Sequence, residues 1–126
     1  FIVCFTFFTL SKLFDLLYSV ESNKDYKRLR KKLTHIFQQH PRLVYASGHD
    51  HNLQYHPIDD GHYIVSGSGT VKSYVRRGKT AAFAYEHKGF ARIDITETGA
   101  VLSFWIPEGD SPQGRLVYRR VLYTNP

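Results

Sequence analysis

The chain changes character at His40-Pro41, where a helical pattern gives way to a series of short strand patterns. Before this point, apolar side chains recur at three- and four-residue steps over residues 23–39, as on one face of an amphipathic helix. Proline disfavours helix in the residue before it, so the helix is expected to end here. The apolar positions of this helix are Tyr26, Leu29, Leu33, Ile36 and Phe37.

The part of the chain after Pro41 predicts β-strands. Aromatic residues make up 15% of the sequence, and aromatic and β-branched residues suit the pleated surfaces of sheets. We expect strands at 42–47, 53–58, 62–69, 80–87, 89–96, 100–106 and 115–123, with turns at 59–61 and 97–99 and a surface loop at 108–114. With 126 residues there is room for one domain. The expected fold class is α+β, with mostly antiparallel strands.

Residues 1–22 form an apolar segment whose role the sequence does not define. The run FIVCFTFFTL is shorter than the roughly 20 apolar residues that a membrane-spanning helix needs, and it lacks the basic start of a signal peptide. It could be the remnant of a signal, a buried strand or sequence foreign to the fold. Cys4 is the one cysteine of the chain, which excludes an internal disulfide.

The formal net charge of +6 raises the question of an anionic partner. A basic solvated exterior explains this charge most simply, and the Lys and Arg residues of the helix fall mostly on the side opposite its apolar face. We therefore expect no nucleic-acid partner. Association with an anionic membrane surface stays open, although no feature of the sequence supports it.

The loop Gly48-His49-Asp50-His51-Asn52 is the strongest candidate site. On an extended segment, two histidines that are two residues apart send their imidazoles to the same side. Two neutral imidazoles can bind one metal ion together, or each can bind one of two ions about 3.5–4 Å apart. Gly48 suits a tight bend at the end of a strand.

Three longer strings carry a resemblance to a known family. They are ASGHDHNLQY at 46–55, HYIVSGSGT at 62–70 and EHKGFARIDIT at 86–96. Together they resemble the C-terminal part of the calcineurin-like metallophosphoesterases, most closely the purple acid phosphatase-like branch. The resemblance covers roughly residues 24–123 and implies part of a β-sandwich in which two sheets pack face to face with helices outside.

The resemblance also implies a chemistry. Family members hydrolyse phosphate esters at a binuclear site of divalent or trivalent ions (Fe, Zn or Mn), which activate a water molecule. His49 would bind one metal ion and His51 the other, and no further catalytic residue is expected in this chain. Gly48, Asp50 and Asn52 would shape the loop. The glycine bend at Ser66, Gly67, Ser68 and Gly69 would pack under the site.

The upstream motifs of such an enzyme are missing. No Asp-x-His, Gly-Asp-x-x-Asp or Gly-Asn-His motif precedes position 49. The resemblance therefore implies that residues 23–126 are the C-terminal portion of an incomplete domain, which lacks its N-terminal half and is inactive alone. It also favours, weakly, a secreted or cell-envelope location. The substrate and the identity of the metal are left open.

Two alternatives remain. The chain could be a non-enzymatic β-rich binding module, with a relic histidine loop and a basic surface that binds an anionic partner. A single-metal site that adds His56 or Asp59 to His51 is a third hypothesis, which the spacing does not favour. The histidines outside the loop are expected to be surface or packing residues; they are His35, His40, His56, His62 and His87.

Overall fold

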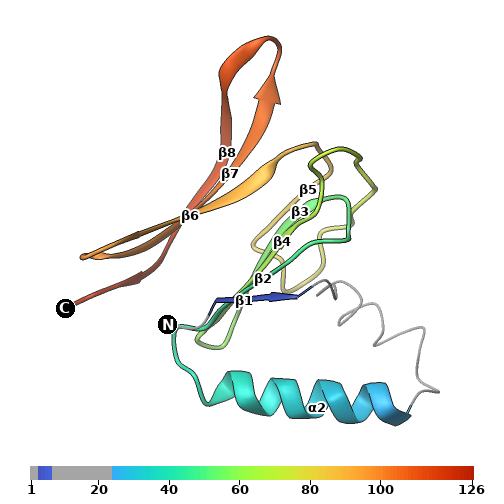
Figure 1. The fold of residues 1–126 in the computed structure, drawn as a ribbon, viewed down its shortest axis with the longest axis vertical. Coiled ribbons are helices and arrows are strands. Elements are labelled where there is room, and N and C mark those ends of the chain that lie inside the picture. Colours follow the sequence, from blue (N-terminus) through green and yellow to red (C-terminus); the bar gives the residue numbers. More distant parts are fainter. Residues whose placement is uncertain (1–2, 7–23) are drawn as a thin grey trace.

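The computed structural model describes residues 3–6 and 24–126, and it has the expected α+β class (Figure 1). The first half of the chain forms β1 (Val3–Thr6), α2 (Lys24–Gln38), β2 (Val44–Ser47), β3 (Leu53–Ile58) and β4 (Gly61–Ser66). The second half forms β5 (Phe83–Tyr85), β6 (Phe90–Thr96), β7 (Gly99–Glu108) and β8 (Ser111–Thr124). No helix among the described residues is long and apolar enough to span a membrane.

The larger sheet has five strands in the order β1-β2-β4-β3-β5. The strands β1, β2 and β4 run parallel, while β3 is antiparallel to both of its neighbours. The β3–β4 hairpin places Tyr55 opposite Ile64, and the turn between the strands falls at Asp59 and Asp60, as the sequence predicts. This topology brings the carboxyl ends of β2 and β4 to the same edge of the sheet.

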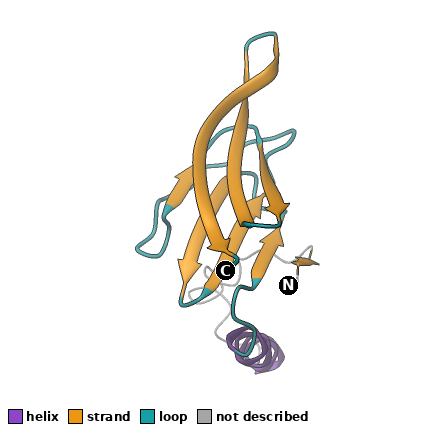
Figure 2. Cartoon of the chain, turned by 90° about the vertical axis from the view of Figure 1, so that its left-hand side faces the viewer, coloured by secondary structure: helices purple, strands orange, loops and turns teal. Residues whose placement is uncertain are grey.

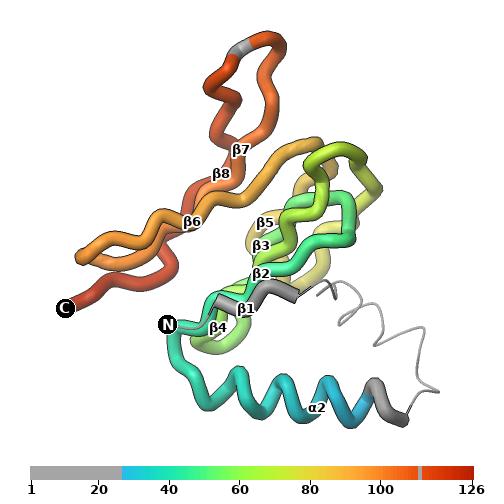
Figure 3. The backbone as a smooth tube through the Cα atoms, viewed as in Figure 1, coloured from blue at the N-terminus to red at the C-terminus, as the bar shows by residue number. Residues whose placement is uncertain are grey.

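The smaller sheet is an antiparallel meander in the order β6-β7-β8. The first turn, at Glu97-Thr98, agrees with the prediction. The predicted loop at 108–114 is wrong, because β7 and β8 continue as paired strands to a turn at Gly109-Asp110. The polar residues there sit on a solvated hairpin that projects beyond the rest of the molecule (Figure 3).

The core lies between the two sheets, which pack face to face (Figure 2). Leu53, Tyr55 and Ile64 face inward from the larger sheet and are almost completely buried. Leu102 and Phe104 of β7 meet them from the smaller sheet. Their alternation along each strand sends the intervening residues of β3 to the opposite face.

That opposite face of the larger sheet is covered in part by α2. The ring of Phe37 lies 5.2 Å from the ring of Tyr45 and 6.2 Å from that of Tyr63, measured between centroids. The predicted apolar stripe is only partly covered, since Leu29 and Ile36 are 50% and 46% exposed. The contact of Phe37 with Tyr45 and Tyr63 therefore fixes the helix on the sheet, while much of its apolar stripe faces solvent.

Some predicted boundaries shift. Within the apolar N-terminal segment, Val3–Thr6 pairs in parallel with β2, and the rest of residues 1–22 lies outside the described residues. The predicted strand at 80–87 is reduced to Phe83–Tyr85, because the preceding residues cross the face of β3 as an irregular segment. The strand predicted at 53–58 agrees with β3 at both ends.

Candidate functional site

The histidine loop follows β2 directly and leads into β3. The side chains of His49 and His51 are both exposed, whereas Asn52 is 4% exposed. The backbone holds the loop in place, because Asn52 N donates to the Asp50 carbonyl at 2.8 Å. On the other side, Ser73 N donates to the His51 carbonyl at 2.6 Å. Both imidazoles thus stand in solvent on a loop whose backbone is hydrogen-bonded from two directions.

His49 has an unusual backbone conformation, with φ at 78°. Residues other than glycine rarely adopt this left-handed region, which costs roughly 1–2 kcal/mol. Such strain persists only where the surrounding structure imposes it, and it occurs preferentially at functional sites. His51 has no such strain, so the two histidines differ in backbone conformation.

The glycine bend packs directly against the histidine loop. A Cβ atom on Gly67 would overlap the carbonyl oxygen of Asp50 and would come within 3.0 Å of His49 N. Gly67 N also donates to the Asn52 carbonyl at 3.3 Å. The neighbouring Ser68 is fully buried, and its Oγ has no hydrogen-bond partner within residues 3–6 and 24–126. The loop and the bend therefore form one packed unit.

The metal-ligand set of this loop is incomplete. Zinc and similar ions take four or more ligands from protein and water together. Among the described residues, no group of three or more His, Cys, Asp or Glu side chains comes together to hold a metal ion. The two exposed imidazoles can contribute to a site, but they do not make a whole one.

A second polar feature lies on the face of β3 turned away from the core. Asn52, Gln54 and His56 are each less than 10% exposed and form one hydrogen-bonded row. Gln54 Nε2 donates to Asn52 Oδ1 at 2.8 Å, and His56 Nε2 lies 3.0 Å from Gln54 Oε1. His56 Nδ1 completes the row at 3.2 Å from Thr80 Oγ1. We call these four residues the polar row.

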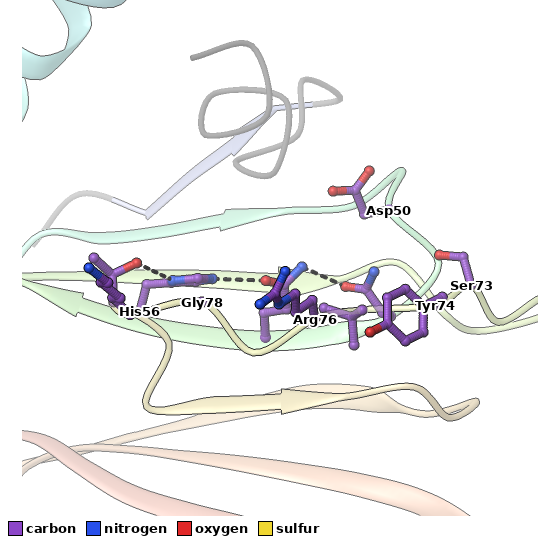
Figure 4. A pocket seen from close by; sticks show the side chains of 11 residues that line it. Asp50, His56, Ser73, Tyr74, Arg76 and Gly78 are labelled. Atoms are coloured by element: carbon purple, nitrogen blue, oxygen red, sulfur yellow. Dashed lines mark hydrogen bonds between the residues drawn. The ribbon is translucent and has the colours of Figure 1, made fainter. Parts of the chain in front are cut away.

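The irregular segment 72–80 closes over the polar row and forms a pocket of about 570 Å³. Figure 4 shows its lining, with Arg76 over the middle of the row and Tyr74 toward the histidine loop. Arg77 anchors the segment, donating from Nε to the Ala81 carbonyl and from a terminal nitrogen to the Ala82 carbonyl. The remaining lining residues are Asp50, Asn52, Gln54, His56, Ser73, Val75, Gly78, Lys79 and Thr80.

Burial shifts the titration of two histidines. It lowers the pKa of His56 in the polar row. Burial is also the main cause that lowers the pKa of His62, where the charge of Arg120 acts in the same direction. His62 Nδ1 lies 2.9 Å from the Tyr55 hydroxyl, whose pKa is raised mainly by burial. Both imidazoles are thus favoured in their neutral form.

Sequence reasoning placed His49 and His51 on one loop but missed the pocket. The roles of Gln54, His56, Arg76 and Lys79 become visible only when segment 72–80 folds back across β3. Two signals were present. Alternation along β3 puts Asn52, Gln54 and His56 on one face, and residues 61–85 contain four Lys or Arg and no Asp or Glu.

Comparison with known proteins identifies a fold relationship. No family model matches the chain, and no curated protein matches it significantly. Among solved structures, the chain is similar to GAP50, described as the anchor in the inner membrane complex of Plasmodium, with a TM-score of 0.67 and 22% sequence identity. The match covers 79% of this chain and 31% of that one, so the chain spans about a third of its neighbour's length. At this identity, the similarity shows the fold alone.

These comparisons correct the family assignment. The strings around the histidine loop resemble those of metallophosphoesterases, but no family model supports that membership. GAP50, a solved structure with a similar fold, is described as an anchor. Short strings of similar sequence can recur on a shared fold without shared family membership, and function must then be argued from the site itself.

Proposed function

We propose that loop 48–52 contributes His49 and His51 to a metal-dependent site for the hydrolysis of phosphate esters, together with ligands from outside the described residues. The proposal rests on the loop itself and not on family membership. The observation that carries it is the pair of exposed imidazoles, with His49 at a positive φ, on a loop whose close contact with Gly67 leaves no room for a side chain at position 67. Positive φ also occurs at Arg42 and Asp59, so the strain at His49 supports the proposal only together with the two exposed imidazoles.

The residues of this chain would hold and orient the metal ions, and they would not activate the water molecule themselves. Bound metal ions such as Zn, Mn or Fe would supply the chemistry, by lowering the pKa of a water molecule to about 7 and neutralising phosphoryl oxygens. Asn52 and Gly67 would fix the loop through the Gly67 N to Asn52 carbonyl hydrogen bond. His49 and His51 are exposed, and their ring nitrogens would be accessible for coordination.

The test uses the protein that carries this chain together with the sequence that precedes it. With Zn²⁺, Mn²⁺ or Fe added, it should hydrolyse para-nitrophenyl phosphate. His49→Ala and His51→Ala should each lower kcat/KM by about 100-fold or more, because loss even of groups that only support metal ligands costs roughly 10–100-fold. His35→Ala, on the exposed surface of α2, is the matched control. Equal activity in all three variants would refute the proposal.

A second candidate function is a non-enzymatic binding module that holds an anionic partner, in a secreted or cell-envelope location. The acid-free cationic stretch at 61–85 favours it, as does the description of the structural neighbour as an anchor in a membrane complex. Co-sedimentation with anionic vesicles, compared with neutral ones, would measure it. Such binding should weaken with salt and should not change in His49→Ala or His51→Ala.

A further inference from the structure

We propose that the pocket between the polar row and segment 72–80 is a binding site for a small oxyanion, a phosphate or carboxylate group, carried on an organic molecule. The site lies beside the histidine loop but does not depend on metal. It therefore goes beyond the hydrolytic function proposed above, and its test runs in the presence of a chelator.

The charges of the lining favour an anion. Arg76 and Lys79 line the pocket, and Asp50 is the one acidic residue of the lining. In Figure 4, Asp50 stands at the edge of the pocket, away from Arg76. Arginine and lysine together suit an oxyanion, because a guanidinium offers a planar fork of donors and an ammonium a compact charge.

Arg76 and Arg77 are adjacent but differ in what they do. Arg77 is engaged with the Ala81 and Ala82 carbonyls and holds the segment in shape. The guanidinium of Arg76 makes no hydrogen bond or ion pair within the described part of the chain, and it faces the pocket. Arg77 thus stabilises the segment that borders the pocket, and Arg76 is available to a ligand.

The hydrogen bonds of the polar row all run in one donor-to-acceptor direction, and the last residue of the row, Asn52, has a donor group that is free within the described residues. An amide oxygen only accepts, so His56 Nε2 donates to Gln54 Oε1, and Nδ1 of the neutral ring accepts from the Thr80 hydroxyl. Gln54 then donates to Asn52 Oδ1. The amino group of Asn52 lies at the end of this chain of hydrogen bonds, and it has no acceptor within residues 3–6 and 24–126. Asn52 lines the pocket, so this amino group can donate to a ligand oxygen there.

The rest of the lining suits an organic body. Tyr74 is 76% exposed although it borders the pocket, and Val75 lies beside it. An exposed aromatic ring on the same segment as Arg76 and Lys79 offers a stacking surface for a planar group. The volume of about 570 Å³ falls within the range of small-molecule sites, roughly 300–1,000 Å³, and exceeds what a bare phosphate needs.

The experiment titrates the full 126-residue chain, with chelator and at low ionic strength, with inorganic phosphate, phenyl phosphate and benzoate, and records backbone amide NMR shifts. We expect saturable binding with shifts confined to residues 50–56 and 73–80. The combined variant Arg76→Gln/Lys79→Gln should weaken binding by about tenfold or more. Lys31→Gln, on the exposed face of α2, should change it less than about twofold, since solvated charges act weakly.

The three probes separate the possible ligands. Tighter binding of phenyl phosphate than of inorganic phosphate, with a loss of this preference in Tyr74→Ala, supports an organic phosphate. Tighter binding of benzoate supports a carboxylate. Absence of saturable binding by all three probes, or an equal effect of the Lys31 and Arg76/Lys79 substitutions, overturns the site. Arg76 and Lys79 are both exposed. Circular dichroism checks that the variants are folded.

Discussion

Gly67 lies so close to Asp50 that no side chain fits between the two backbones. A Cβ atom at position 67 would overlap the carbonyl oxygen of Asp50, in the middle of the histidine loop. The contact joins the end of β4 to the loop that follows β2, at the edge where parallel strands present their carboxyl ends. The close packing of the loop therefore requires that a residue distant in sequence, Gly67, carries no side chain.

Gly67→Ala should destabilise the protein by about 1–3 kcal/mol, the usual cost of forcing an extra methyl group into a packed region. The Asp50 backbone has to move, and the conformation of His49 changes with it. Urea unfolding measures the loss of free energy. Gly69→Ala is the matched control, because nothing lies within 4 Å of a Cβ at that position. Equal losses of unfolding free energy in both variants would contradict the close contact between Gly67 and the Asp50 backbone.

His49→Gly should increase stability by up to about 1 kcal/mol, although it removes a candidate metal ligand. Glycine adopts a φ of 78° without the steric cost that histidine bears. His51→Gly should give no such gain, because His51 has an ordinary φ. The urea midpoints of the two variants provide the comparison. A gain in the His51 variant, or a loss in the His49 variant, would show that the strain is not a cost.

Stability should fall as the pH drops below about 6.5, the ordinary histidine pKa. Burial lowers the pKa of both His56 and His62 in the folded state, so the unfolded chain takes up protons first. Stability is then full above the unfolded pKa and is lost as the pH falls toward the lower, folded pKa. Each histidine contributes a slope of at most about 1.4 kcal/mol per pH unit.

Unfolding free energies measured from pH 5 to 8 test this dependence. His56→Gln and His62→Gln should each reduce the slope, and the double variant should remove both contributions. An unchanged slope in the double variant would mean that other groups govern the acid response.

Phe104→Ala should destabilise the protein by about 3–5 kcal/mol. The ring is fully buried between the sheets and stacks on Phe83 of the larger sheet, with 4.9 Å between centroids. Phe90→Ala should cost about 1 kcal/mol or less, since this ring is 55% exposed on the outer side of the smaller sheet. Thermal unfolding of the two variants measures both losses of stability. Similar losses in Phe104→Ala and Phe90→Ala would contradict the packing described for the core.

Local patterns predicted much of the fold. The strand at Leu53–Ile58 lies between a polar loop and an Asp-Asp-Gly turn, so its ends were visible in the sequence. The strands at 100–106 and 115–123 were predicted, but their extension toward the turn at 109–110 was missed, because residues 108–114 are polar and contain Gly109 and Gly114, both with positive φ. Strands that extend beyond the core into solvent need no apolar alternation, and hence carry no such signal.

The candidate site also has a part that local sequence predicts and a part that only tertiary folding creates. His49 and His51 were predicted to share a loop because they are neighbours in sequence. The pocket depends on Arg76 and Lys79 reaching the face of β3 through tertiary folding, which periodicity does not reveal. The contact between Gly67 and Asp50 is similar, since it joins segments that no local pattern connects.

A Zn²⁺ titration of the full 126-residue chain, followed by NMR of the histidine ring nitrogens, shows directly whether loop 48–52 binds metal. If the loop is built to supply metal ligands, the signals of His49 and His51 shift together at the lowest Zn²⁺ concentration. The rings of His56 and His62, which are already hydrogen-bonded within the fold, remain unchanged there. If His35, His40 or His87 responds first, or all exposed histidines respond alike, the loop has no special affinity for metal and the account is wrong.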